Sequence, residues 1–179
     1  MDPAARGRAR RRRQAVVSCL ESVAVNKASQ PYLIQPLTPA DLDAVMEIER
    51  LSFRTPWLRQ AFEEEMARSW ARVEILRHAV SGRPVAFADY WLVADELHIL
   101  NIATHPEARR QGHGARLLRH ILDVARRASY RTIELEVRRS NLAAQALYRG
   151  FKFQQVGIRS RYYEDNDEDA IVMTLRLRD

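Results

Sequence analysis

The chain has 179 residues, of which 46% are hydrophobic and 29% are charged, which suits one globular domain with a single core. No window approaches the roughly 18 uninterrupted apolar residues that a membrane-spanning helix needs, so we expect a soluble protein. A net charge of +6 would suggest a nucleic-acid-binding surface, but residues 1–30 carry five of these six charges.

We expect residues 1–30 to form a basic, disordered tail and residues 31–179 to form the folded domain. The tail holds seven basic side chains against two acidic ones. Such a tail can bind RNA or ribosomes through phosphate contacts. A solvated leader, or an extension from an upstream start codon, explains the same composition, and we favour these interpretations over nucleic-acid binding.

The tail only imitates a signal peptide. Arginines at 10–13 precede a short apolar run, but five residues separate Arg13 from Cys19. This distance is shorter than the apolar segment of about 7–15 residues that a signal peptide requires. Cys19 is the only cysteine, which excludes an intrachain disulfide and fits a reducing compartment. We therefore expect a cytoplasmic protein without membrane association, and a monomer.

The folded part begins with a predicted strand over 32–37 and two helices. Thr38 can cap the first helix, Pro39 suits its first position, and Asp41 stands where a capping-box acid would. This helix runs to Phe53, and the second covers 58–68. The helical spacing of the first rests on Leu42, Val45, Met46 and Leu51.

The middle of the chain is rich in predicted strands. Residues 71–78 are extended, and a turn follows at 81–84. The β-rich runs 85–93 and 96–104 are joined by two residues, which predicts a hairpin.

From Gly112 the apolar periodicity becomes helical. The predicted elements from there on are a helix to about Ala128, a half-buried strand over 132–138, a helix over 141–149, and strands over 151–160 and 169–177 that flank an acidic loop at 164–168. The whole order, β-α-α-β-β-β-α-β-α-β-β, predicts a single mixed α/β domain.

The loop 109–115 lies between a predicted strand and a helix. A helix N-terminus presents unpaired N–H groups and a partial positive charge, which favours a pyrophosphate. Gly112 and Gly114 let an anion approach the backbone closely, and Arg109 and Arg110 add cationic donors. The dinucleotide-binding motif is excluded because Leu117 occupies its third glycine position.

The loop and several ordered segments together resemble the GCN5-related N-acetyltransferase (GNAT) superfamily, from about residue 32 to the C-terminus. The loop matches the pattern [RQ]-x-x-G-x-[GA]. Within the superfamily the resemblance is greatest to the bacterial ribosomal-protein-alanine acetyltransferases of the RimI type. The other matching segments are 101–106, 135–141, 146–148, 161–163 and 168–170, with 52–53 and 56–57 in the first helical region.

The resemblance implies an acetyl-CoA-binding fold whose sheet is splayed between the strands 96–104 and 132–138. The backbone of Ile102, Ala103 and Thr104 would pair with the pantetheine arm and polarise the acetyl carbonyl. Asn141 would contact acetyl-CoA or cap its own helix. The loop residues implied in binding are Arg109, Arg110, Gln111, Gly112, His113, Gly114 and Ala115.

The implied chemistry is acetyl transfer to an amine. Because a protein α-amine has a pKa near 7.7–8.0, a base must take its proton before it attacks. By resemblance Glu136 is this base, directly or through a water, with Glu134 on the same face as the less favoured alternative. Tyr148 is the implied proton donor to the leaving thiolate. The competing interpretations are a surface ion pair for Glu136 and a packing role for Tyr148.

Other mechanisms are not supported by the sequence. Cys19 is the only thiol and lies outside the matched region, so we expect direct attack in a ternary complex rather than an acyl-cysteine route. The five histidines have no metal-ligand spacing, and we expect no metal.

Two positions depart from the pattern. Ala115 stands where RimI proteins often have an arginine, with Arg116 next to it. Lys152-Phe153 replaces the usual Gly-Phe, and Gly150 lies two residues earlier, which allows a different turn geometry.

The expected acceptor is a protein N-terminus that begins with Ala or Ser, such as that of a basic ribosomal protein. Trp57, Tyr162 and Tyr163 are the candidate peptide-binding residues, beside the acidic loop. The alternatives are acetylation of a small-molecule amine or a lysine side chain, and a non-catalytic acetyl-CoA-binding or RNA-associated protein.

Overall fold

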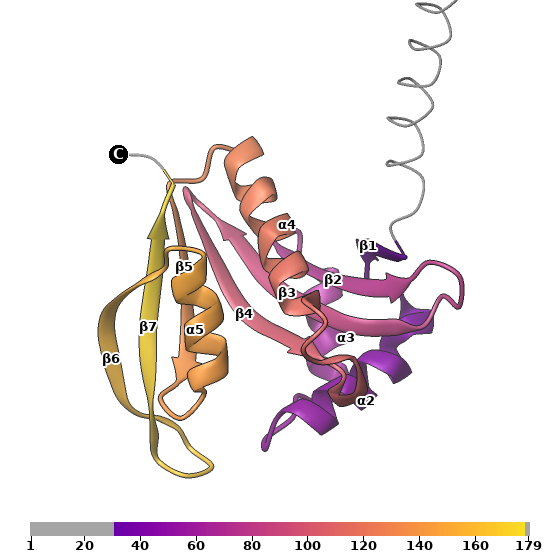
Figure 1. Cartoon of the computed structure of the whole chain (residues 1–179), viewed down its shortest axis with the longest axis horizontal. Coiled ribbons are helices and arrows are strands. Elements are labelled where there is room, and N and C mark those ends of the chain that lie inside the picture. The colour runs from indigo at the N-terminus through magenta and orange to yellow at the C-terminus, as the bar shows by residue number, and fades with distance from the viewer. Residues whose placement is uncertain (1–30, 178–179) are drawn as a thin grey trace, which may run out of the picture. The chain divides into compact units, whose positions relative to one another are not determined.

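A computed structural model describes residues 31–177, so the predicted tail and Cys19 lie outside the described part of the chain. Seven strands form one sheet in the order β1-β2-β3-β4-β5-β7-β6 (Figure 1). The strands are β1 (Tyr32–Pro36), β2 (Ala71–His78), β3 (Pro84–Val93), β4 (Glu96–Thr104), β5 (Thr132–Arg138), β6 (Gln154–Tyr163) and β7 (Glu168–Arg176). The α-helices are α2 (Leu42–Ser52), α3 (Arg59–Ala67), α4 (His113–Arg127) and α5 (Leu142–Gly150), and the short 3-10 helices are η1 (Pro39–Asp41) and η2 (Pro106–Ala108).

The sheet is mixed and mostly antiparallel. The pairs β2–β3, β3–β4, β5–β7 and β6–β7 are antiparallel, whereas β4 and β5 run parallel. A parallel pair needs a crossover, and α4 supplies it. The predicted fold class, a single α/β domain with a mixed sheet, and the predicted element order are confirmed.

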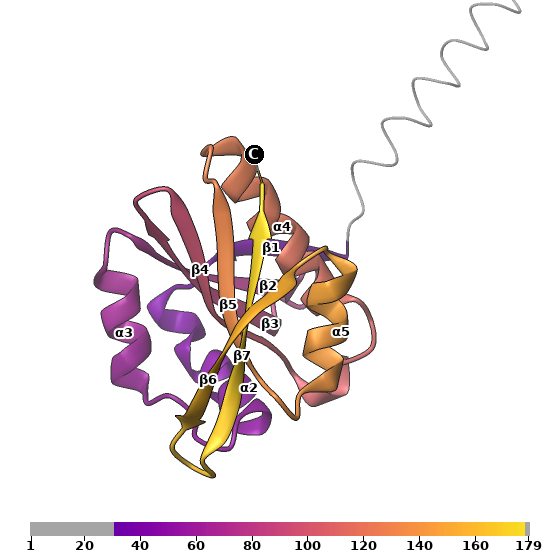
Figure 2. The same ribbon diagram turned by 90° about the vertical axis from the view of Figure 1, so that its left-hand side faces the viewer.

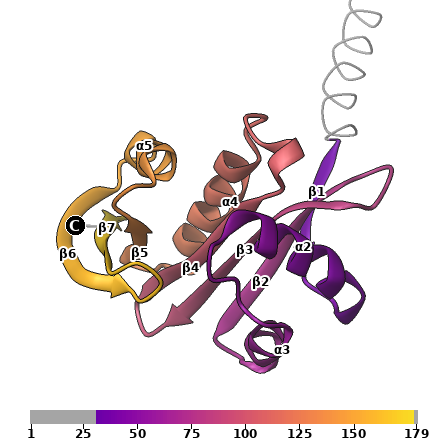
Figure 3. The ribbon, with the colours of Figure 1, turned by 90° about the horizontal axis from the view of Figure 1, so that it is seen from below.

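Helices cover both faces of the sheet. Seen from below, α4 and α5 lie on one side and α3 lies on the other (Figure 3), and the view along the β5–β7–β6 side also separates α5 from α3 (Figure 2). The core beneath α2 and α3 is apolar, since Val45, Ile48 and Phe62 pack with Ile75 and Phe87 of the sheet.

The predicted start of the first helix is present. The Thr38 N–H and hydroxyl both donate to the Asp41 carboxylate, at 3.3 and 2.6 Å. Arg77 pairs with the same carboxylate at 2.8 Å. The predicted apolar face of α2 needs one correction, because Leu51 is 51% exposed whereas Ile48 and Glu49 are buried. A period of 3.6 residues brings Ile48 and Glu49 onto the face of Val45, and it turns Leu51 outward.

The sheet opens between β4 and β5. Their pairing runs from Glu96 and Thr132 only as far as Ile99 and Leu135, and the two strands then diverge (Figure 1). A register shift between β3 and β4 lies at the same point, since Tyr90 pairs with Ile99 and Asp89 pairs with Asn101. The extra residue, Leu100, is a bulge that bends β4 away from β5.

The last part of the chain differs from the prediction in two details. β6 begins three residues later than predicted and continues to Tyr163, so both tyrosines are strand residues rather than part of a loop. The turn after α5 does not use Gly150, which is still helical. Lys152 has a φ of 73°, the left-handed conformation that a glycine favours. The turn therefore keeps the geometry that Gly-Phe would give, with a lysine in it.

Candidate active site

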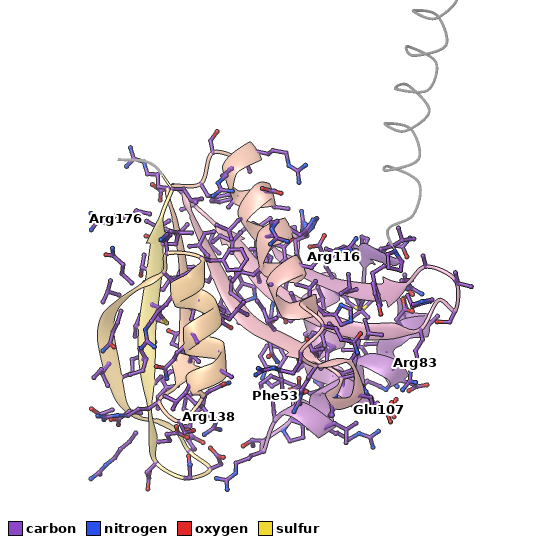
Figure 4. The ribbon with its side chains drawn as sticks, in the orientation of Figure 1. Phe53, Arg83, Glu107, Arg116, Arg138 and Arg176 are labelled. Atoms are coloured by element: carbon purple, nitrogen blue, oxygen red, sulfur yellow. The ribbon has the colours of Figure 1, made fainter. Side chains whose placement is uncertain are left out.

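A cleft of about 1100 Å³ occupies the opening between the two halves of the sheet. Phe53 and Arg138 lie on its two sides (Figure 4). Its lining comes from the α2–α3 segment and β4 on one side, and from β5, α5 and the β6–β7 turn on the other. The predicted site residues that line it are Trp57, Ile102, Glu136, Asn141, Tyr148, Tyr162 and Tyr163.

Glu136 lies in the cleft, whereas Glu134 does not line it. The side chain of Glu136 is 18% exposed, and its Oε1 pairs with Arg159 Nη2 of β6 at 2.9 Å. The same guanidinium lies 4.0 Å from Glu134. The surface ion pair considered from the sequence thus exists through Oε1, and the same side chain lines the cleft. The two interpretations of Glu136 are compatible.

Tyr148 projects from α5 and is buried at the back of the cleft. Its ring packs against Phe153 with the centroids 5.8 Å apart. Burial raises the pKa of the Tyr148 phenol well above its usual range, and the nearby Tyr163 adds to this effect. The phenol is therefore protonated at neutral pH, as a proton donor must be.

The loop 109–115 does not line the cleft. It follows β4 and η2 and leads into α4, at the end of β4 where the sheet opens (Figure 1). Gly112 is the N-cap of α4 with a φ of 80°, so this position needs a glycine. Gly114 has an ordinary conformation, and a Cβ there would only touch Leu147 at 3.6 Å. The backbone N–H groups of the first turn of α4 lie at the end of this loop.

Several loop side chains already have partners within the protein. Arg109 donates to the Thr104 carbonyl at 3.1 Å and to Ser52 Oγ at 3.3 Å, and so braces the loop against the end of α2. Gln111 donates to the Glu107 carbonyl at 3.4 Å. Arg110 has a φ of 64° and is exposed. The remaining predicted positions here are Ala103, buried in β4, Thr104, half-buried at its end, His113, buried in α4, and Ala115, half-buried in α4.

Asn141 has the capping role that was one of its two expected functions. It is the N-cap of α5, and its side-chain oxygen accepts the Ala144 N–H at 3.1 Å. It also lines the cleft, so contact with a ligand is sterically open to it.

Arg138 holds the β6–β7 turn over the cleft. It pairs with Asp165 at 2.7 Å and with Glu168 at 3.2 Å, and its guanidinium lies 3.8 Å from the ring centre of Tyr163. Glu168 also accepts the Ser140 N–H at 2.6 Å. Hydrogen bonds from Ser140 and Arg138 hold the pKa of Glu168 at about 2, so it stays ionised at any physiological pH.

The paired tyrosines form an aromatic wall beside this cluster. Tyr162 and Tyr163 have ring centroids 5.2 Å apart in an edge-on arrangement. Trp57 lies on the opposite side of the cleft, where its ring packs on Phe62 at 5.6 Å. The three aromatic residues proposed for peptide binding therefore do border one cleft.

Sequence reasoning missed Glu49, Asn101 and Arg138 as site residues. All three line the cleft. The signal for Glu49 was an acid on the apolar face of a helix, next to Ile48. The partners of Arg138 lie 27 and 30 residues away along the chain, and no local pattern indicates them.

Two further findings concern the described residues. Among residues 31–177 no group of three His, Cys, Asp or Glu side chains is placed to hold a metal ion. Within the same range no helix has the length and apolar character required to cross a bilayer.

Comparisons with known proteins agree with the geometry. Residues 42–153 match the model of the acetyltransferase (GNAT) family. The chain is 37% identical over 144 residues to the [ribosomal protein bS18]-alanine N-acetyltransferase of Escherichia coli K12, covering 79% of this chain and 95% of that one. It is also 37% identical over 140 residues to the putative enzyme of this name from Bacillus subtilis, covering 78% and 91%.

A solved structure has the same fold. The crystal structure of the ribosomal-protein-S18-alanine N-acetyltransferase from Escherichia coli superposes with a TM-score of 0.75 at 36% identity, over 83% of this chain and 95% of that one. Proteins of this family use acetyl-CoA, and the opened sheet, the glycine loop and the cleft are all present here. The chain belongs to the GNAT acetyltransferase family and is an N-acetyltransferase.

Proposed function

We propose that this enzyme transfers the acetyl group of acetyl-CoA to the α-amine of an N-terminal alanine, and that its substrate is ribosomal protein bS18. The observation that carries the proposal is that Glu136 and Tyr148, from β5 and α5, border one cleft together with the aromatic residues at 162 and 163. The names of the Escherichia coli and Bacillus subtilis relatives supply the substrate. Since ribosomal proteins are made in the cytoplasm, we propose that location for the enzyme.

In the proposed reaction Glu136 takes the proton from the acceptor ammonium through Oε2, directly or through a water. The amine nitrogen then forms a bond to the acetyl carbonyl carbon, and the bond from that carbon to sulfur breaks. The nitrogen releases its second proton to solvent as the amide forms, and Tyr148 gives its proton to the departing thiolate and recovers one from the same solvent. No covalent enzyme intermediate is needed.

Acetyl-CoA would be held by backbone groups more than by side chains. The N–H groups at the start of α4, at Gly112, His113 and Gly114, suit a pyrophosphate. The divergence of β4 from β5 leaves Ile102, Ala103 and Thr104 without a neighbouring strand on that side, so their peptide groups suit the amides of pantetheine. Arg110 is an exposed residue of the loop and can add a phosphate contact.

The test is acetylation of a short basic peptide that begins with Ala. We expect Glu136→Gln and Tyr148→Phe to lower kcat by about 100-fold or more, because each removes one proton-transfer group. Glu134→Gln is the matched control, since this acid lies on the same strand face but outside the cleft, and it should change kcat less than threefold. Near-normal kcat in both site variants contradicts the assigned roles.

The choice of acceptor is tested separately with the wild-type enzyme. A peptide with a blocked N-terminus and a free lysine should not be acetylated, and neither should spermidine. Transfer to these amines but not to the Ala peptide would favour the alternative acceptors, and acetyl-CoA binding without transfer to any amine would favour the non-catalytic alternative.

A further inference from the structure

Glu49 stands out among the acids that line the cleft. It lies in the last turn of α2 and is 1% exposed, yet its carboxylate reaches the cleft. The reaction described above does not use it. Acids this deeply buried are rare in proteins unless a specific set of partners holds them.

Its partners come from the two segments that build this side of the cleft. The Trp57 backbone N–H donates to Oε1 at 3.0 Å, and Asn101 Nδ2 donates to Oε2 at 3.1 Å. Trp57 belongs to the connection between α2 and α3, and Asn101 follows the bulge in β4. One carboxylate therefore links Trp57 to the strand that continues into Ile102.

Both donors are neutral. Burial raises the pKa of Glu49 to about 6, although the Trp57 amide and Asn101 lower it. The group is thus mainly ionised at pH 7 and can accept both hydrogen bonds. If either donor moves away, a buried carboxylate oxygen is left without a hydrogen bond, which raises the free energy of the folded state. The carboxylate is therefore a rigid link.

We infer that Glu49 is a positioning residue. It fixes Trp57, and with it the α2–α3 side of the proposed acceptor site, against β4 at the distance that acetyl transfer needs. The inference rests on the proposed function in taking the acceptor to be a peptide. It assigns no proton transfer to Glu49, because both carboxylate oxygens are engaged by donors of the protein.

The test compares Glu49→Ala, which removes both hydrogen bonds, with Glu49→Gln. A glutamine can still accept from the Trp57 N–H, and Asn101 can turn its amide to present oxygen to the new Nε2. We therefore expect Glu49→Ala to raise the KM for the Ala peptide about tenfold, and Glu49→Gln to stay within about threefold of the wild type. Glu47→Ala is the matched control, because Glu47 is exposed on the same helix.

A merely structural role would lower the fraction of active enzyme and hence the apparent kcat, while leaving KM unchanged. Hydrogen exchange at the Trp57 amide gives a second measurement that needs no acceptor. We expect this amide to be protected in the wild type and in Glu49→Gln, and to exchange at least tenfold faster in Glu49→Ala at equal global stability.

Asn101→Ala removes only one of the two hydrogen bonds of Glu49 and keeps the bond from the Trp57 amide. If the two residues act through one hydrogen bond, the double variant Glu49→Ala/Asn101→Ala should be no worse in KM than Glu49→Ala alone. An unchanged KM and unchanged Trp57 exchange in Glu49→Ala would overturn the inference, as would a Glu49→Gln enzyme as impaired as Glu49→Ala. Failure of the wild type to acetylate the Ala peptide would instead count against the proposed function, and the exchange measurement would still decide the role of Glu49.

Discussion

The two walls of the cleft are held in place by different forces. On the β5 side, Arg138 binds the β6–β7 turn through ion pairs with Asp165 and Glu168, and Arg159 pairs with Glu136. On the β4 side, Glu49 accepts hydrogen bonds from a backbone amide and a side-chain amide, and both of these donors are neutral. The β5 wall is thus sensitive to salt, whereas the β4 wall depends on burial.

This difference between ion pairs and buried hydrogen bonds suits the proposed roles of the two sides. The proposed acceptor peptide binds beside the β6–β7 turn, where partly exposed ion pairs break and reform at small cost. The β4 wall carries the strand proposed to hold acetyl-CoA, and buried hydrogen bonds keep such a strand fixed. Three experiments test this difference between the two walls.

The largest effect is expected for Asp89, which lies on β3 opposite Asn101 and is fully buried. Burial, with the nearby Glu65 and Glu49, raises the pKa of Asp89 from 3.8 to about 8. Between these values the folded state keeps a proton that the unfolded state has lost. The contribution of Asp89 to the free energy of unfolding should therefore fall as pH rises from about 4 to about 8, by at most about 1.4 kcal/mol per pH unit.

Asp89→Asn removes this titration. The difference in unfolding free energy between Asp89→Asn and the wild type should grow in favour of the variant from pH 5 to pH 8 and level off above pH 8, as measured by urea denaturation. Asp123→Asn is the control, since Asp123 is an exposed residue of α4. A difference that stays constant with pH would show that Asp89 is ionised throughout and that the β4 wall does contain a buried charge there.

An intermediate effect is expected on the β5 wall. Arg138→Ala removes two ion pairs and the contact with Tyr163, and it leaves two carboxylates close together. Because the Arg138 side chain is 21% exposed, we expect a loss of about 2 kcal/mol rather than the 3–5 kcal/mol of a fully buried pair. Arg139→Ala is the control, with one exposed pair and an expected loss below about 0.5 kcal/mol.

Salt sharpens this experiment. In 1 M NaCl the loss caused by Arg138→Ala should shrink, whereas the faster Trp57 exchange caused by Glu49→Ala should not change. Equal salt dependence on the two sides would mean that the two walls are held by the same kind of force.

The smallest effect is expected at Lys152, in the turn that follows α5 on the β5 side. A glycine adopts this left-handed conformation without the steric cost that a lysine Cβ brings, which stabilises the folded Lys152→Gly protein. The greater entropy of glycine in the unfolded chain offsets part of this gain. We expect a net gain of about 0.5–1 kcal/mol and a higher Tm. Lys152→Ala keeps the backbone penalty and should give no gain, and a similar gain from alanine would indicate that charge, not conformation, is responsible.

The sequence predicts those features whose cause lies within a few neighbouring residues. The alternation of Ile133, Leu135 and Val137 is enough to predict β5 and its buried face, and Gly112 before an amphipathic run is enough to predict the start of α4. The resemblance to the family then predicts where the sheet opens.

The features that escaped prediction depend on contacts between distant segments. Glu49 and Asn101 are 52 residues apart, and only the folded sheet brings them together. The conformation of Lys152 was missed for a different reason, since a lysine gives no local sign of a positive φ.

The opening of the sheet gives β4 and β5 one bare side each in the middle of the molecule. A bare strand on the outside of a protein invites another chain to pair with it, and exposed edges are often guarded by charge or proline. Here the two bare sides face each other across the cleft, inside the molecule. The run Ile99–Ala103 can therefore stay almost wholly apolar, and the peptide groups that a ligand needs remain unguarded without making the protein prone to aggregate.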